Sequence, residues 1–437
     1  MIIDQVAVEP TNDGWTRRAR VRGATGEHIV EFHLPHVEGV SLRTDEDASC
    51  FLAATILPAM LGGEDIKVDA PVSARVLAGC DDVVTAFARW NPDLRPAMVT
   101  AAGVVAASNP GPLTGCMFSR GADSMASAVI DRPGGPSLTH LIHVVGLEPH
   151  HSDRTRAEEV RLARLAGELM ELPVVVPRTN VRELTDGRCD WADAHGAALA
   201  ALALSMDGLF GRVVVPSTQA VDELVPFGSS PVLEPNLSSE SVAIVHDSVS
   251  LDRVGKVWLL ARDRPDLLPY LKVCWAEDRP DNCGRCGKCL LTMCALQAAD
   301  ALPLATGFPD TVPLDEIRRL RPAPVQSRQH WVAAARALGA EGERGRTRAA
   351  ILDALRRSAR PGPRERALQW WARLRGERAR LTPSWKDPTR GFEWRHHTAL
   401  LDLLTRGRPT RPIAETAEPP LVLGRARPRA DDVSQPG

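Results

Sequence analysis

The chain has 437 residues, of which 44% are hydrophobic, and its formal net charge is −2. This composition describes a globular protein with enough apolar material for two or three domains, and it excludes disorder along the whole length. No stretch approaches the roughly 18–20 consecutive apolar residues of a membrane span, and the start lacks the basic and apolar regions of a secretory signal. We therefore expect a cytoplasmic protein that does not enter a membrane. Nine cysteines in such a chain favour metal binding or buried thiols over a disulfide framework.

Residues 1–108 predict a small α+β module that carries no recognisable motif. Strand patterns occupy residues 27–35 and 97–105, and helical patterns occupy residues 47–61 and 71–90. A cluster of Asn, Pro and Gly ends the module.

Residues 109–305 alternate short β-rich runs with helical patterns. The runs predict strands at 115–118, 138–147, 173–177 and 211–218, and helices at 123–130, 154–170 and 193–206. This alternation is typical of an α/β fold with a parallel sheet flanked by helices and linked by right-handed crossovers.

Residues 306–408 form a helical pattern in which basic residues outnumber acidic ones. Two interpretations compete: a polyanion-binding surface with interleaved tryptophans, or a helical appendage that packs on the main domain. We favour packing, because Trp370 and Trp371 lie in an amphipathic run and arginine is common throughout the chain. Residues 409–437 are rich in Pro, Arg and Ala and predict a disordered tail.

The stretch "SRGADS", residues 119–124, follows the first predicted strand of the parallel sheet and opens a helix. Such a helix start offers unpaired N–H groups to an anion at the edge where open parallel sheets bind ligands. The stretch resembles the SGGxDS loop of the PP-loop ATP pyrophosphatase superfamily, with Arg120 in place of the first glycine. The plainer alternative is a capped strand-to-helix turn without a nucleotide.

The resemblance implies that the loop holds the β and γ phosphates of ATP while an acceptor becomes adenylated. Ser119, Gly121, Asp123 and Ser124 match the pattern: the serines would donate to phosphate, and Asp123 would hold Mg²⁺ or orient the loop. Arg120 could bond to the phosphates, or it could disable the loop if this position requires a positive φ.

A cysteine cluster lies further along the chain, where the ligands follow a C-x8-C-x2-C-x2-C pattern: Cys274, Cys283, Cys286 and Cys289. Four thiolates that converge on a tight glycine-containing turn predict a closed structural zinc site, with an iron–sulfur cluster as the chemical rival. Cys294, one helical turn further on, is predicted to be a buried thiol.

The loop and the cysteine pattern together resemble the 7-cyano-7-deazaguanine synthases over roughly residues 112–300. This resemblance implies an adenine nucleotide alpha-hydrolase-like, Rossmann-like fold and a structural zinc. It also implies an ATP-dependent enzyme that adenylates a carboxylate, releases pyrophosphate and transfers the acyl group to nitrogen. Three reactions are consistent with this resemblance: asparagine-synthase-like amide formation, nitrile formation, and epimerisation of an activated carboxylate. The first hundred residues and the basic C-terminal region have no counterpart in that family.

Further polar residues are weaker candidates for nucleotide or substrate contacts. Glu148, His150 and His151 follow the second strand, where the superfamily holds adenosine. His195 is expected on a helix that faces the sheet edge or the substrate. After the fourth strand, five residues are either pocket groups or turn and cap residues: Ser229, Ser230, Ser238, Ser239 and Glu240.

The leading hypothesis is thus an AMP-forming, PP-loop ligase or synthase that uses ATP, Mg²⁺, Zn²⁺ and a small carboxylate substrate. The residues expected to act in catalysis are Asp123, Ser124 and Arg120, and those expected to bind ATP are Ser119, Arg120, Gly121, Asp123, Ser124 and Glu148. One alternative is an RNA-modifying enzyme with the basic region as its RNA surface; thiolation would then need a further reactive cysteine, for which Cys189 and Cys116 are poor candidates. The other is a non-catalytic, zinc-stabilised scaffold.

Overall fold

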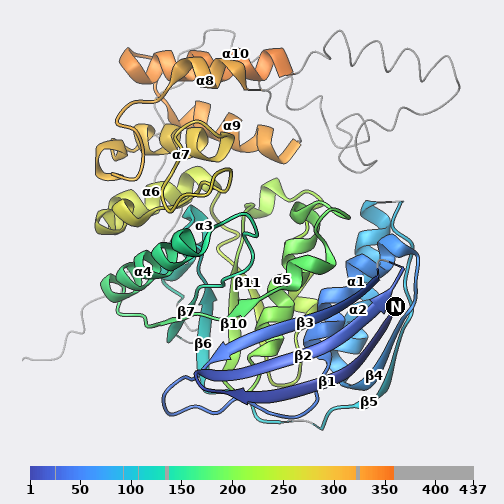
Figure 1. Ribbon diagram of the computed structural model, residues 1–437. Coiled ribbons are helices and arrows are strands. Elements are labelled where there is room, and N and C mark those ends of the chain that lie inside the picture. Colours follow the sequence, from blue (N-terminus) through green and yellow to red (C-terminus); the bar gives the residue numbers. More distant parts are fainter. Residues whose placement is uncertain (25, 92, 107, 133–136, 321–324, 359–437) are drawn as a thin grey trace, which may run out of the picture.

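The protein is described by a computed structural model that covers residues 1–358 except 25, 92, 107, 133–136 and 321–324 (Figure 1). The side chains of residues 325–327 are also not described. The predicted tail, Trp370 and Trp371 lie outside the described residues, as does the end of the predicted helical region.

The N-terminal part forms a six-stranded sheet in the order β5-β4-β1-β2-β3-β9. Its strands are β1 (Ile2–Thr11), β2 (Gly14–Gly23), β3 (Gly26–Pro35), β4 (Ile66–Val72), β5 (Val99–Val104) and β9 (Arg178–Thr179). β1, β2 and β3 pair in an antiparallel arrangement, whereas β1, β4 and β5 pair in parallel. In β4, buried and more exposed residues alternate, as expected for a strand with one face on the core.

Two helices, α1 (Ser49–Gly62) and α2 (Ala74–Trp90), lie against this sheet (Figure 1). Every residue of α1 from Ser49 to Met60 is buried, because the helix lies between the sheet and α5 (Trp191–Ser205). A helix that is apolar on all sides is typical of such a fully enclosed position.

The second sheet has five parallel strands in the order β11-β10-β6-β7-β8. These are β6 (Leu113–Met117), β7 (His140–Ile142), β8 (Val174–Val175), β10 (Phe210–Pro216) and β11 (Ala243–Asp247). The predicted α/β architecture with a parallel sheet is confirmed. In chain order the strands run 5-4-1-2-3, so the direction of the connections reverses between β6 and β10. This reversal is the ligand-binding position of doubly wound sheets.

Helices cover both faces of the parallel sheet. Met117, Ile142 and Val213 belong to the core shared with α5, whereas Cys116, Leu141 and Val214 belong to a second core on the opposite face. The helices of this second side are α3 (Ala122–Val129), α4 (Asp153–Leu169), α6 (Arg253–Asp263), α7 (Gly287–Ala298), α8 (Leu314–Arg319), α9 (Val325–Ala337) and α10 (Gly342–Ser358). Short 3-10 segments complete the chain: η1 (Val181–Leu184), η2 (Val221–Glu223), η3 (Glu234–Leu237), η4 (Pro265–Tyr270) and η5 (Leu302–Leu304).

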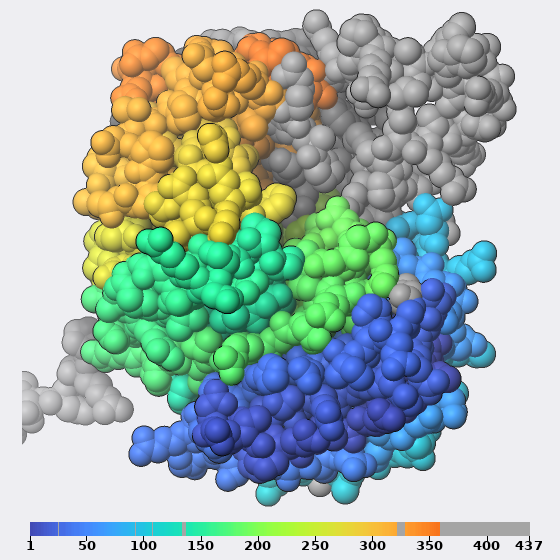
Figure 2. All heavy atoms as spheres, in the orientation of Figure 1, coloured from blue at the N-terminus to red at the C-terminus, as the bar shows by residue number. Residues whose placement is uncertain are grey.

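The N-terminal module and the parallel sheet share one hydrophobic core. β9 comes from the middle of the chain yet pairs with β3, and α5 packs on α1. In Figure 2 the N-terminal residues form one end of the molecule and the helices after α6 form the other. Within the described residues, no helix is both long and apolar enough to cross a membrane.

Candidate functional site

The "SRGADS" stretch lies at the carboxyl end of β6, beside the reversal of the parallel sheet. The loop is closed by its own serines: the Ser119 N–H donates to Ser124 Oγ at 3.2 Å, and the two hydroxyl oxygens lie 3.3 Å apart. Gly121 is the N-cap of α3 and no side chain caps the helix. The Gly121 N–H donates to Ser119 Oγ at 3.3 Å, and the N–H groups that follow it carry the positive end of the helix dipole without a cap from the N-cap side chain.

Arg120 occupies the left-handed region with φ 60°, the conformation that a glycine adopts most readily. Its guanidinium is buried and donates to the carbonyl oxygens of Pro280 at 3.0 Å and Tyr270 at 3.4 Å. Burial lowers the pKa of Arg120 to about 10, although the charges of Glu159 and Glu158 oppose this effect. The turn thus keeps the glycine-like backbone, and the arginine side chain bonds to the segment that leads into the cysteine cluster.

Asp123 lies in the first turn of α3 and forms ion pairs with two cations from α6. Arg253 Nη2 donates to Asp123 Oδ2 at 2.5 Å, and Lys256 Nζ lies 3.4 Å from Oδ1. Burial by itself would raise the pKa of Asp123, but the Arg253 and Lys256 charges outweigh it and hold this pKa below the ordinary value. The carboxylate is therefore ionised, and both of its oxygens have cationic partners.

Lys256 also ties this cluster to the loop after β10. Its ammonium donates to the carbonyl oxygen of Ser217, the first residue after that strand, and the side chain is fully buried. Burial lowers the pKa of Lys256, while Asp123 opposes this shift. The two loops that flank the reversal are thus joined through α6, which places two positive charges beside the start of α3.

The four predicted cysteines converge, since the Sγ atoms of Cys274, Cys283, Cys286 and Cys289 all lie within 4.8 Å of one another. Cys289 Sγ lies 3.4 Å from Cys286 Sγ and 3.8 Å from Cys283 Sγ. A tetrahedral site with zinc–sulfur bonds of about 2.3 Å requires sulfur–sulfur edges of about 3.8 Å. The donor set and its spacing therefore fit a metal ion such as zinc. Cys294 is completely buried on α7 and lies outside the cluster, as predicted.

Asn282 organises the turn that carries the first cysteine. Its Oδ1 accepts from the backbone N–H groups of Val273 at 2.8 Å and Cys274 at 3.1 Å, and its Nδ2 donates to the Leu271 carbonyl at 2.7 Å. The Lys272 N–H donates to the Arg120 carbonyl at 2.9 Å. The cysteine cluster and the serine loop are therefore adjacent, linked through both the backbone and the side chain of Arg120.

The three candidate residues after β7, Glu148, His150 and His151, differ in their burial and in their partners. Burial raises the pKa of Glu148, and the positive charges of His151 and Lys288 partly oppose this effect. His151 is buried, with Nδ1 3.1 Å from Glu159 Oε2, whereas His150 is exposed. The predicted contact of Glu148 with a nucleotide stays a prediction, and His151 has a structural partner.

Lys288 lies between two of the metal-ligand cysteines and adds a further cation. It is solvent-exposed, and its ammonium lies 5.9 Å from the centre of the Trp275 ring. Its charge lowers the pKa of Glu148 and of His195, so these groups lie near it. The turn of the cysteine cluster thus presents a positive charge toward the region that follows β7.

His195 lies on α5, as predicted, and burial lowers its pKa to about 4. Its Nδ1 pairs with the Trp191 carbonyl at 3.2 Å, and its ring packs 4.9 Å from that of Phe227. These contacts are typical of a neutral histidine that is packed in the protein interior.

The serine-rich segment after β10 makes the hydrogen bonds of turn and cap residues, and two of its members, Ser239 and Glu240, also line a cavity at the amino edge of the parallel sheet. Ser238 Oγ donates to the Pro235 carbonyl at 2.7 Å, and Ser239 Oγ accepts from the Val242 N–H at 2.9 Å. Glu240 accepts from the Arg75 N–H at 3.0 Å. Because Ser238, Ser239 and Glu240 precede β11, they lie at the amino edge of the sheet, opposite the loop. Ser229 and Ser230 bond to the buried Glu234.

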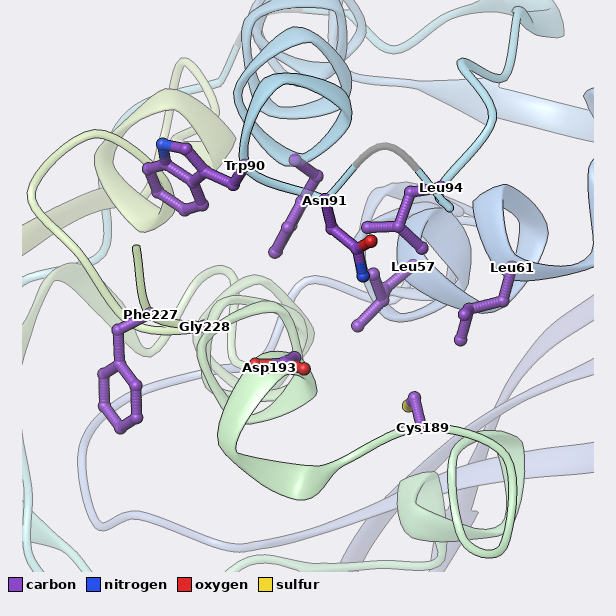
Figure 3. A pocket seen from close by; sticks show the side chains of 10 residues that line it. Leu57, Leu61, Trp90, Asn91, Leu94, Cys189, Asp193, Phe227 and Gly228 are labelled. Atoms are coloured by element: carbon purple, nitrogen blue, oxygen red, sulfur yellow. The ribbon is translucent and has the colours of Figure 1, made fainter. Parts of the chain in front are cut away.

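Two cavities lie away from the loop. One of about 30 Å³ lies between α1, α2 and the segment before α5, where Trp90, Cys189 and Phe227 line it (Figure 3). Its size suits about one water molecule, so it is too small for a substrate. The other, of about 310 Å³, lies at the amino edge of the parallel sheet, and its lining includes Arg75, Arg212, Ser239 and Glu240.

Sequence reasoning missed Arg253 and Lys256, which are the closest charged partners of the loop. The signal present in the sequence was a helix start, "LDRVGK", with Asp252 as an N-cap and two basic residues one turn apart. Only the fold brings these residues to Asp123.

Comparisons with protein-family models, with curated proteins and with solved structures found no match.

Proposed function

We propose that the protein is an AMP-forming enzyme of the PP-loop type, which adenylates a substrate carboxylate, releases pyrophosphate and transfers the acyl group to nitrogen. The observation that carries this proposal is the loop at the sheet reversal. A glycine-like turn at Arg120, an uncapped helix α3, and the cations Arg253 and Lys256 meet there.

This arrangement is suited to holding a polyphosphate. Backbone N–H groups at a helix start and nearby cations stabilise anionic oxygens, and they favour the additional charge that develops as pyrophosphate departs. Ser119 and Ser124 would exchange their mutual hydrogen bond for bonds to phosphate oxygens. Ser119 is exposed, whereas Ser124 is buried and its hydroxyl donates to the Gly121 carbonyl at 3.1 Å, so Ser124 would exchange that bond for one to the leaving group.

Asp123 orients the loop in this proposal. Both of its oxygens already have cationic partners, so the carboxylate is not free to bind Mg²⁺. Mg²⁺ commonly enters such sites already coordinated by the phosphates of the nucleotide, and it would neutralise part of their charge. Arg253 and Lys256 would supply the remaining positive charge from the protein.

The four-cysteine site would hold zinc in a structural role. Four thiolates close the tetrahedral shell and leave no position for a reacting group. The zinc would fix the turn that receives the Arg120 guanidinium and thereby support the loop. A thiolation reaction is disfavoured, because burial raises the pKa of Cys116 and of Cys189 to about 12 and keeps both thiols protonated.

Calorimetric titration of the full chain with Mg²⁺-ATP tests the proposal directly. We expect saturable binding that excess pyrophosphate displaces and that Ser124→Ala weakens. Arg336→Gln is the matched control, since Arg336 is an exposed residue on α9. Absence of ATP binding at millimolar concentration would contradict the proposal.

A further inference from the structure

His330 on α9 is a buried histidine whose two ring nitrogens have no hydrogen-bond partner among the described residues. Its side chain is 6% exposed. Polar groups in such positions are nearly always paired, because an unpaired buried donor or acceptor is unfavourable. Nε2 has no partner among the described residues, and Nδ1 faces Glu223 Oε2 without bonding to it, so the ring can accept a partner that these residues do not supply.

The surroundings of His330 include Asp123, from the "SRGADS" stretch, and the two cations that pair with it. The charged groups that face it are Glu223 from η2, Asp123 from α3, and Arg253 and Lys256 from α6. Its Nδ1 lies 3.8 Å from Glu223 Oε2, which is beyond hydrogen-bond length. α9 packs against α6 and α7, so the C-terminal helices carry this ring to the cluster that holds Asp123.

The electrostatics of the ring favour an anionic partner. Burial lowers the pKa of His330 to about 3, with Arg253 and Lys256 acting in the same direction and Asp123 opposing them. The histidine is therefore neutral in the free protein and can donate one N–H. A polyanion bound beside it would reverse the local field and raise this pKa, since nearby negative charge favours the protonated ring.

We propose that His330 binds the pyrophosphate portion of the nucleotide, so that the helices after the cysteine cluster complete the polyphosphate site. This inference rests on the proposed function, because it assigns a further ligand to the same site. It gives a role to α9, which lies beyond the part of the chain that resembles the deazaguanine enzymes. His330 donates to a phosphate oxygen and takes up a proton when the anion binds.

Glu223 is the competing site of proton uptake. Burial raises its pKa to about 7, and the neighbouring Asp252 and Asp222 act in the same direction. A polyanion would push this carboxyl further toward its protonated form, so proton uptake in the wild type alone does not identify the group. The experiment therefore needs variants of both residues.

The full chain is titrated with inorganic pyrophosphate and Mg²⁺ at pH 7.5 in two buffers of different ionisation enthalpy, which gives both affinity and proton uptake. His330→Asn keeps a donor but cannot take up a proton, and Glu223→Gln removes the competing carboxyl. Arg336→Gln is an exposed substitution on the same helix. We expect about tenfold weaker binding and loss of proton uptake in His330→Asn, a typical effect of losing one charge-assisted bond. Both controls should retain affinity, and Glu223→Gln should retain most of the proton uptake.

Unchanged pyrophosphate affinity and unchanged proton uptake in His330→Asn would overturn the inference, while the wild-type binding would leave the proposed function standing. If the wild type binds neither pyrophosphate nor ATP, both fail. Should His330→Asn not fold, proton uptake is compared between the wild type and Glu223→Gln alone. Retained uptake then supports His330, and complete loss assigns the proton to Glu223 and contradicts the inference.

Discussion

Asp123 Oδ2 and Arg253 Nη2 lie 2.5 Å apart, although 130 positions separate the two residues in the chain. The pair joins the first turn of α3 to the first turn of α6, and Lys256 adds a second cation on the same carboxylate. Two helix starts that are fixed to each other in this way hold their N–H groups and cations in a defined geometry. Preorganisation of this kind is what stabilisation of a departing anion requires.

Asp123→Asn tests this relationship. The amide is nearly isosteric but neutral, so Arg253 and Lys256 lose their counter-ion and the loop loses its orientation. Turnover of ATP to AMP should fall by two or more orders of magnitude, since one preorganised contact typically contributes about 3 to 4 kcal/mol to the transition state. The measurement is the rate of AMP release, with the zinc content of the same preparation as the internal control. Loss of zinc together with activity would show general misfolding instead.

Arg120→Gly separates backbone strain from side-chain bonding. A left-handed non-glycine residue costs about 1–2 kcal/mol, whereas each hydrogen bond from a charged donor contributes about 1.5–3 kcal/mol. Because the guanidinium donates to two carbonyl oxygens, we expect the lost bonds to outweigh the relieved strain and the melting temperature to fall.

The matched control for this change is Glu171→Gly. Glu171 also has a positive φ, 56°, but it is exposed, so glycine there should raise the melting temperature slightly. A higher melting temperature in Arg120→Gly would contradict the structural role of the side chain. A fall in ATP affinity that exceeds the fall in stability would show that the guanidinium serves the phosphates.

The cysteine cluster predicts about one zinc ion per chain. Cys283→Ser or Cys286→Ser should abolish zinc binding and lower the melting temperature, because metal binding contributes to folding free energy. Cys294→Ala is the control, since that thiol is buried outside the cluster and its loss should leave the metal content unchanged. The measurement is the zinc content per chain of the three purified variants. A fully stable protein without metal would refute the site.

Glu234 predicts a pH dependence of stability. It is a buried carboxyl whose pKa is raised from 4.5 to about 7 by desolvation, against hydrogen bonds from Ser229 and Ser230. Between these values the folded protein keeps the proton that the unfolded chain has released. The contribution to stability is therefore present below pH 4.5 and is lost as the pH rises through 7.

Glu234→Gln removes this ionisation while keeping the shape. We expect little effect at pH 5 and a higher melting temperature than the wild type at pH 8, with a free-energy gain of roughly 3 kcal/mol at most. His246 Nδ1 lies 3.7 Å from Glu234 Oε2, but burial lowers the pKa of His246 to about 4, so this ring is neutral at pH 5 and at pH 8 and does not titrate between the two measurements. An equal difference between the two proteins at both pH values would contradict the assigned ionisation.

The fold class and the positions of most helices follow from local sequence patterns. The helix predicted at 154–170 is α4, Asp153–Leu169, because its apolar spacing and its Ser152 cap are both local signals. The four cysteines were predictable for the same reason, since three of them lie within a single turn.

The partners of the loop could not be predicted, because they depend on which segments the fold brings together. Arg253 and His330 approach Asp123 from α6 and α9, and neither carries a motif. β1 and β2 were also missed, since their polar and charged residues obscure the alternation, and β9 pairs with a strand far away in sequence. The positive φ of Arg120 likewise became evident only from the backbone.

The central claim is that the loop directs cleavage between the α and β phosphates of ATP. The most direct measurement uses ATP labelled at the α phosphorus, incubated with Mg²⁺, the full chain and the small-molecule fraction of a cell extract, with the labelled products separated. The account predicts labelled AMP or an AMP adduct in the wild type and neither above background in Asp123→Asn. Labelled ADP as the sole product that depends on the protein would contradict it.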